Sequence, residues 1–257
     1  MVAGAAMKLL LVSDLHYVLK QLDWIQSVTA DFDLVAVVGD LLDIASTLPL
    51  EAQIVVVLNH LTRLERRARH LVVCSGNHDL DARDAAGEKV PRWMARVRRA
   101  GIPTDGDAVV LDDTLVTVCP WWDGPEARAA IGAQLARDAA ARLGRWIWLY
   151  HAPPDDSPTS WAGKRHYGDP ALRDWIAQYR PDIVLCGHIH QAPFRQGGSW
   201  VDRVADTWVF NAGRQIGPVP AHVVIDTSAG TAAWYSLAGT EELRLDDPQA
   251  RPLSSIR

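Results

Sequence analysis

The stretch DIVLCGHIH, residues 182–190, decides how the rest of the chain is arranged. Its short aliphatic run, Ile183–Cys186, is typical of a buried strand. Gly187 ends the run and allows the backbone to turn or to approach another group closely. His188 and His190 follow at alternate positions, so both side chains can point into a cleft. Two surface histidines on a loop would look the same, and the remainder of the chain must decide between these interpretations.

Four earlier apolar runs end in a similar way. They are Lys8–Ser13, Leu34–Val38, Leu71–Cys74 and Trp146–Tyr150. The residues that follow them are Asp14 and His16, then Asp40, then Asn77, His78 and Asp79, and then His151. Because the carboxyl ends of strands in an open α/β sheet converge on one side, we expect these side chains to share a cleft. Carboxylate, imidazole and amide donors without a thiolate suit Mn, Fe, Zn, Co or Ni.

The pattern of elements changes along the chain. Helices are predicted at Leu19–Ala30, Pro49–Arg69, Gly87–Arg99, Pro125–Leu143 and Asp169–Tyr179, and a hairpin at Ala108–Leu111 and Leu115–Cys119. The last third is mostly strands, at Trp200–Val204, Thr207–Phe210, Val223–Asp226 and Thr231–Ser236. Alternating strands and helices predict helices packed on a mainly parallel sheet, which the tail would extend with antiparallel strands. We expect a mixed sheet or a two-sheet sandwich with helices outside.

Bulk composition excludes several classes of protein. The 257 residues suffice for one large α/β domain, and 48% apolar with 22% charged residues is ordinary for a globular protein. The net charge of −5 gives no electrostatic signal for duplex nucleic acid. No segment approaches the ~20 apolar residues of a membrane helix. The three cysteines lack C-x-x-C spacing and the N-terminus lacks the features of a signal peptide, so we expect a cytoplasmic protein with reduced thiols.

The ordered motifs resemble those of a known family. They are D-x-H at 14–16, G-D-x-x-D at 39–43, G-N-H-D at 76–79, a lone histidine at 151 and G-H-x-H at 187–190. This set is similar to that of the calcineurin-like metallophosphoesterases, and the match covers every core motif. The resemblance implies an α/β fold with an α+β-like tail, built as a four-layer α/β/β/α sandwich of mixed sheets flanked by helices. We expect one such domain over residues 1–240 and a polar tail over 241–257.

The resemblance also implies a role for each motif residue. One metal ion would be held by Asp14, His16, Asp40 and His190, and a second by Asp40, Asn77, His151 and His188, with Asp40 as the bridge. A metal-bound hydroxide would attack the phosphorus atom. His78 would face the substrate as a hydrogen-bond donor or general acid, and Asp79 would hold its imidazole in the required tautomer. Asp43 would orient a ligand such as His16, although a helix N-cap would equally explain an Asp there.

The surrounding sequence narrows the substrate class. Protein phosphatases of the family carry Arg-Gly after the second motif and Glu after G-N-H, where this chain has Ile44-Ala45 and Asp79. We expect a phosphodiesterase that acts on a small or cyclic-nucleotide phosphodiester, with a phosphomonoesterase as the alternative. A nuclease and a non-catalytic scaffold are weaker alternatives. Candidate substrate-binding residues, several of them in the long loop 155–169, are Trp121, Trp122 and Trp161 for stacking and Lys164, Arg165 and His166 for phosphate oxygens.

Overall fold

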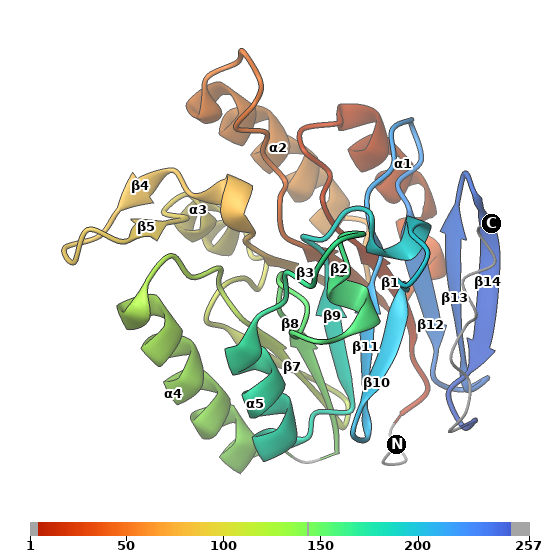
Figure 1. The fold of residues 1–257 in the computed structure, drawn as a ribbon. Helices are drawn as coiled ribbons and strands as arrows, with labels where there is room; N and C mark the ends of the chain where they lie inside the picture. The colour runs from red at the N-terminus through yellow and green to blue at the C-terminus, as the bar shows by residue number, and fades with distance from the viewer. Residues whose placement is uncertain (1–4, 143, 248–257) are drawn as a thin grey trace.

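The computed structural model describes residues 5–142 and 144–247 (Figure 1). In this part of the chain two six-stranded sheets pack face to face, and helices cover both outer faces. The first sheet carries α1 (Leu19–Val28), α2 (Leu50–Glu65) and α3 (Met94–Arg99). The second carries α4 (Pro125–Ala141) and α5 (Pro170–Tyr179). The predicted four-layer α/β/β/α sandwich is therefore confirmed.

The first sheet has the order β14-β13-β12-β1-β2-β3. Its strands are β1 (Lys8–Val12), β2 (Leu34–Val38), β3 (Leu71–Cys74), β12 (His222–Asp226), β13 (Thr231–Ser236) and β14 (Gly239–Arg244). The first three run parallel, and β12–β14 add an antiparallel extension. β2 is buried at every position, as expected for a parallel strand that is covered on both faces.

The second sheet has the order β10-β11-β9-β8-β7-β6. Its strands are β6 (Ala108–Leu111), β7 (Thr114–Val118), β8 (Arg145–Leu149), β9 (Ile183–Cys186), β10 (Val201–Val204) and β11 (Thr207–Asn211). β7, β8, β9 and β11 run parallel, while the edge strands β6 and β10 are antiparallel. The tail was predicted to be antiparallel, and β11 corrects that prediction because it pairs in parallel with β9.

Alternate residues of the strands supply different cores. Ile147 and Leu149 of β8 point into the core between the sheets, whereas Trp146 and Trp148 pack beneath α4 and α5. This period of two is what a strand covered on both faces requires. The large buried side chains also include four further tryptophans, Trp93, Trp200, Trp208 and Trp234, so core packing accounts for much of the unusual tryptophan content.

Several predicted element boundaries differ from the structure; the helix predicted to end at Arg69, for example, ends at Glu65. Residues 87–99 do not form one helix, because Lys89–Val90 (β5) pairs with Ala82–Arg83 (β4) and the helix begins only at Met94, after Pro91. Residues 241–244, expected to open a polar tail, belong to β14, and residues 248–257 lie outside the described part. α4 ends at Ala141, and Leu143 is likewise outside it.

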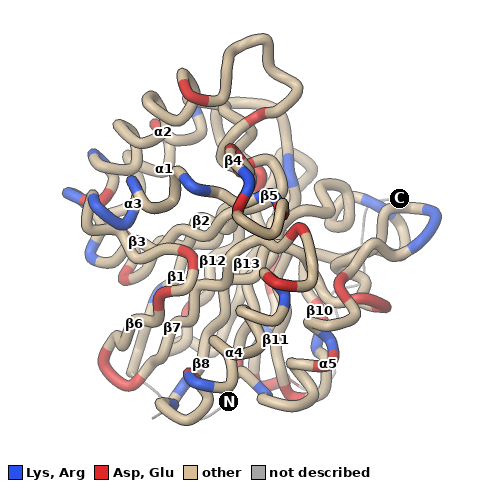
Figure 2. Tube along the Cα trace, turned by 90° about the vertical axis from the view of Figure 1, so that its left-hand side faces the viewer, with Lys and Arg blue, Asp and Glu red and all other residues tan. Residues whose placement is uncertain are grey.

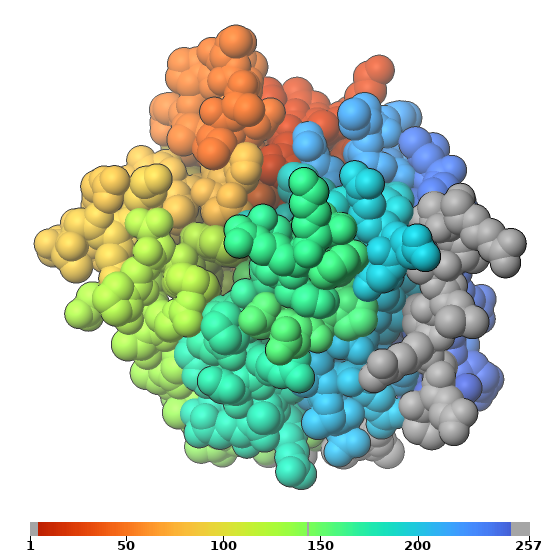
Figure 3. All heavy atoms as spheres, viewed as in Figure 1, coloured from red at the N-terminus to blue at the C-terminus, as the bar shows by residue number. Residues whose placement is uncertain are grey.

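Acidic and basic residues are both distributed over the molecule. Figure 2 shows acidic and basic residues interspersed along the trace, with the basic residues of α3 close together. Among the described residues, no helix has the length and apolar character needed to span a membrane. Loop 155–169, green in Figure 3, covers the middle of the face displayed there.

Candidate metal centre

The seven predicted metal ligands come together where strands of both sheets end. Each follows its strand directly or within a few residues: Asp14 and His16 after β1, Asp40 after β2, Asn77 after β3, His151 after β8, and His188 and His190 after β9. Because the five strands all deliver their carboxyl ends to this edge, residues as far apart in the chain as Asp14 and His188, 174 positions, become neighbours. The fold therefore brings side chains that are distant in the sequence into one cluster.

Asp40 lies at the middle of this cluster. Its Oδ2 is 3.3 Å from His151 Nε2 and 3.6 Å from His16 Nε2. One group of mutually close donor atoms, all within 4.8 Å of one another, comprises Asp14, His16, Asp40 and His190; another comprises Asp40, His151 and His188. Asn77 joins the second group, because its Oδ1 lies 2.8 Å from His188 Nδ1. Asp40 is the residue that these two groups share.

The orientation of His151 fits a cation in this cluster. Its Nδ1 lies 2.8 Å from the carbonyl oxygen of Val38, which places a proton on Nδ1 in the neutral ring. Its Nε2 is buried and has no hydrogen-bond partner in the described part of the chain. Burial alone would lower the pKa of His151, but the charges of Asp40 and Asp14 raise it to about 9. Carboxylates that favour a proton at this nitrogen also favour a metal cation beside it.

The other titratable groups have the protonation states that metal ligands need. Burial lowers the pKa of His16 and that of His188 to about 4, so both rings are neutral near neutral pH. Burial acts to raise the pKa of Asp14, but a hydrogen bond from His190 and the charge of His151 hold it well below its usual range. Ionised carboxylates and neutral imidazoles are the forms that bind divalent metals.

The backbone is strained at this cluster. Five non-glycine residues here have positive φ, namely Asp14 (55°), His16 (41°), Tyr17 (59°), Asp40 (54°) and His188 (65°). Such left-handed conformations cost roughly 1–3 kcal/mol each and persist only where surrounding contacts impose them. Here His16 N donates to Asp40 O (2.9 Å) and His188 N to Asp14 Oδ1 (3.0 Å). The unfavourable backbone conformations thus occur at the positions that bring the donor atoms together.

Two glycines permit the close approach of the motif loops. A Cβ at Gly76 would lie 2.2 Å from Asp40 Oδ1 and 2.8 Å from His151 Nε2. A Cβ at Gly187 would lie 2.5 Å from Asp14 Oδ2. Real Cβ atoms do not make such contacts, so any larger residue must displace the donor atoms.

His78 and Asp43 lie at the border of the cluster. The ring of His78 meets that of His16 edge-on, with centroids 4.4 Å apart, and its Nδ1 lies 3.4 Å from Ile44 N. The carboxylate of Asp43 is grouped with nitrogens of His16 and His78, as an orienting role would require. Asp43 Oδ1 also accepts a hydrogen bond from Ala45 N (2.9 Å). The alternative N-cap role is wrong, because α2 begins at Leu50.

Asp79 has a different role from the one predicted. Its carboxylate accepts hydrogen bonds from the backbone nitrogens of Gly76 (2.8 Å), Leu41 (3.0 Å) and Leu42 (3.0 Å), and no hydrogen bond joins it to His78 in the part of the chain described. Burial, aided by the charge of Asp40, raises its pKa to about 8. Asp79 therefore ties the loop after β2 to the loop after β3, and it does not set the tautomer of His78.

Two of the six predicted substrate-binding residues lie beside the cluster. Trp121 contacts the rings of His188 and His151, with centroids 5.0 and 5.6 Å apart. Lys164 lines a cavity of about 400 Å³ that His188 and His190 also line. Tyr167 and Gln191, which were not predicted from the sequence, belong to the same lining. We refer to this cavity as the histidine groove.

The other four predicted residues make contacts of a different kind. The Trp122 ring lies under the Arg128 guanidinium at 3.6 Å, and Trp161 Nε1 donates to Gln196 O (3.0 Å). Arg165 lies over the ring of Tyr167 at 4.2 Å. His166 Nδ1 lies 2.9 Å from Ser157 O within its own loop. These four side chains therefore make contacts within the protein that stabilise the loops in which they lie.

Arg214 is a further residue that the sequence analysis did not single out. It follows β11, whose carboxyl end lies at the same edge as that of β9, because the two strands are parallel. Its backbone N donates a hydrogen bond to His190 O (3.1 Å). Burial is the largest influence on the pKa of His16, followed by the charges of Asp40 and Asp14, and the charge of Arg214 also lowers this pKa. Had β11 been predicted to run parallel to β9, Arg214 would have been expected at the same edge of the sheet as His188 and His190.

Comparison with known proteins identifies related sequences and folds. The calcineurin-like phosphoesterase superfamily domain matches residues 7–230. A search of the curated proteins finds no match. The solved structure of TT1561 from Thermus thermophilus has a TM-score of 0.60 and 16% identity, covering 94% of this chain and 100% of that one. Purple acid phosphatase PPD1 from yellow lupin (Lupinus luteus) seeds has a TM-score of 0.53 and 13% identity, covering 96% of this chain and 53% of that one. At these identities the likeness concerns the fold.

Proposed function

The chain belongs to the calcineurin-like phosphoesterase superfamily, and we propose on this basis that it is a metal-dependent phosphodiesterase with a two-metal centre. Its substrate would be a small or cyclic-nucleotide phosphodiester. The observation that carries the proposal is the position of Asp40, which belongs to two groups of donor atoms at once. A carboxylate has two oxygens, so Asp40 could be a ligand of a metal ion in each group.

The donor set fits two cations of the Mn, Fe, Zn, Co or Ni type. Asp14, His16, Asp40 and His190 would hold one, and Asp40, Asn77, His151 and His188 the other. When bound, such a pair supplies Lewis acidity that activates water and neutralises phosphate charge. The strained backbone and the glycine contacts fix the donor atoms before any ligand arrives, as efficient metal sites require.

The chain's own residues would position the ester. Because His78 Nδ1 faces the N–H of Ile44, the neutral ring carries its proton on Nε2 and can donate it to a phosphate oxygen or to the leaving group. Lys164 at the histidine groove and Arg214 beside His16 would pair with the remaining phosphate oxygens. Tyr167, which is 47% exposed, offers a ring for stacking on a flat group of the substrate.

Other functions have different support. A phosphomonoesterase is the second candidate, because two cationic side chains near the groove suit a phosphate dianion. A nuclease would need an extended basic surface, whereas acidic residues are interspersed with the basic ones along the trace in Figure 2. A non-catalytic scaffold would not need the complete donor set that this chain carries.

Turnover of two chromogenic esters tests the proposal. With added Mn, bis(p-nitrophenyl) phosphate should be hydrolysed with a higher kcat/KM than p-nitrophenyl phosphate. Faster hydrolysis of the monoester would refute the diesterase assignment. Asp40→Asn should abolish both activities and lower the metal content. A purified chain without bound metal that stays inactive after Mn is added would support a scaffold.

A further inference from the structure

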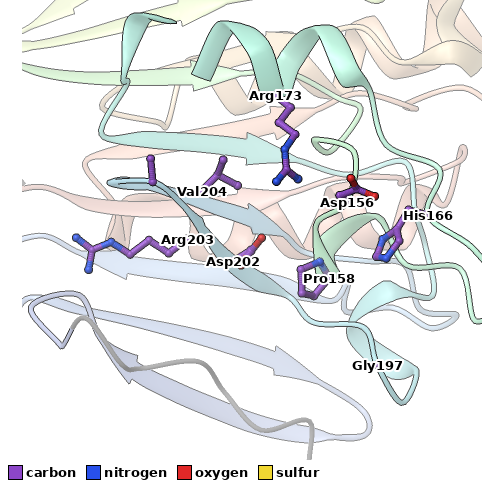
Figure 4. Close-up of a pocket in the computed structure, with 9 residues that line it drawn as sticks. Asp156, Pro158, His166, Arg173, Gly197, Asp202, Arg203 and Val204 are labelled. Atoms are coloured by element: carbon purple, nitrogen blue, oxygen red, sulfur yellow. The ribbon is translucent and has the colours of Figure 1, made fainter. Parts of the chain in front are cut away.

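A second cavity lies on the other side of loop 155–169. Its volume is about 390 Å³, within the range of small-molecule sites, and it shares no lining residue with the histidine groove. Loop 155–169, α5 and β10 form its walls. Figure 4 shows Arg173 reaching from α5 toward Asp202 on β10, with Asp156 and His166 of the loop beside them.

Asp202 is the most informative residue in this cavity. It is only 9% exposed, yet its carboxylate has no hydrogen-bond or ion-pair partner in the described part of the chain. Its carboxylate is reached through the cavity, where a cation or several hydrogen-bond donors can face it. Because Asp202 lines the cavity, its missing partner is expected to enter from there. An ammonium group supplies both a positive charge and three hydrogen-bond donors.

Arg173 provides the opposite charge. Its Nη1 donates to Asp155 O (2.7 Å), which holds the guanidinium at the cavity wall and leaves other N–H groups for a ligand. Within the described residues no ion pair links Arg173 to Asp202 or Asp156, although all three line the cavity. The two ends of the cavity therefore keep their charges separate, with space between them. A planar guanidinium is suited to a carboxylate or phosphate.

The charge balance of the lining selects a class of ligand. Arg203 is paired with Asp206 (3.7 Å) outside the cavity, so Arg173 is the positive charge that faces the acidic residues Asp156 and Asp202. A plain anion would leave Asp202 without a cation, and a plain cation would leave Arg173 without an anion. We propose that this cavity binds a small zwitterion, with its ammonium group on Asp202 and its acidic group, a carboxylate or a phosphate, on Arg173.

Isothermal titration calorimetry on the full chain tests this proposal. The probes are O-phosphoethanolamine and glycylglycine, which pair an ammonium group with a phosphate and a carboxylate, respectively. Ethanolamine and inorganic phosphate carry one charge type each. At least one zwitterion should bind saturably and at least tenfold more tightly than both single-charge probes. The stronger of the two zwitterions identifies the acidic group.

Variants decide whether binding occurs in this cavity. Asp202→Asn keeps the side-chain shape and should weaken zwitterion binding at least tenfold, as should Arg173→Gln. Asp174→Asn changes an exposed acid on the same helix that does not line the cavity, and its Kd should equal that of the unsubstituted chain. Circular dichroism checks that each variant is folded. The proposal is overturned if neither zwitterion binds, if single-charge probes bind equally well, or if folded Asp202→Asn and Arg173→Gln both bind with unchanged Kd.

Discussion

Replacing Gly76 by alanine tests whether close backbone approach sets the geometry of the metal centre. Gly76 has φ −118° and ψ −173°, an extended conformation that alanine adopts without strain. Its backbone N donates to Asp79 Oδ2, and alanine keeps this hydrogen bond. The substitution therefore adds one methyl group without imposing backbone strain or removing this hydrogen bond. Any effect must come from the space that the methyl group occupies.

The size of the effect follows from the contacts. The new Cβ would lie 2.2 Å from Asp40 Oδ1 and 2.5 Å from Asp40 N. Restoring ordinary van der Waals separation requires a shift of about 1 Å. A misplacement of that size costs about 100-fold in rate, which corresponds to about 2.7 kcal/mol of transition-state stabilisation. We expect kcat/KM for bis(p-nitrophenyl) phosphate to fall about 100-fold and metal content to fall as well.

The matched control is Gly132→Ala in the middle of α4. A Cβ there would meet only the Trp175 ring, at 3.6 Å, which is an ordinary contact. Alanine should raise the free energy of unfolding by up to about 1 kcal/mol through its helix propensity and leave kcat/KM unchanged. The reasoning is refuted if Gly76→Ala retains metal and a kcat/KM within threefold of the unsubstituted chain.

Three further substitutions probe other parts of the structure. His188→Ala should reduce bound metal from about two ions per chain to about one by elemental analysis, while His222→Ala, outside the cluster, should not; equal metal content would contradict the ligand assignment. Arg214→Gln should raise KM for the diester about tenfold, the loss of one charge-assisted hydrogen bond, with metal content unchanged; an unaltered KM would exclude Arg214 from the substrate site. Asp105, whose Oδ2 is buried without a partner in the described residues, has its pKa raised by burial to about 7. The native state therefore binds more protons than the unfolded state between pH 4 and 7, so Asp105 lowers stability as pH rises through that window. Urea unfolding should show Asp105→Asn gaining up to about 4 kcal/mol over the unsubstituted chain from pH 4 to pH 8, and parallel stability curves would contradict this.

The features that sequence predicted well are local ones. Each candidate ligand stands next to the apolar run that forms its strand, so strand ends and ligands could be located together. The alternation of strands and helices is also visible in local sequence, and it correctly predicted that helices cover the sheets. The helix predicted at 87–99 failed because Pro91 and the pairing of β4 with β5 outweigh a helical pattern that extends over only one short segment, Met94–Arg99.

The features that sequence did not predict depend on distant contacts. Asp79 looked like a partner of its neighbour His78, but its hydrogen bonds reach Leu41 and Leu42, which are 38 and 37 positions away. Arg214 was overlooked because nothing local indicates that β11 runs parallel to β9. The cavity around Asp202 is formed by loop 155–169, α5 and β10, whose relative positions no local pattern encodes.

The left-handed residues of the metal centre have an evolutionary consequence. Asp14, Asp40 and His188 hold conformations that glycine adopts freely and other residues adopt at a cost. A mutation such as Asp14→Gly would relieve that backbone strain while it removes a donor atom. Selection for folding and selection for chemistry therefore oppose one another at these positions. A population screened only for well-folded, abundant protein would be free to drift toward inactive descendants that retain this fold.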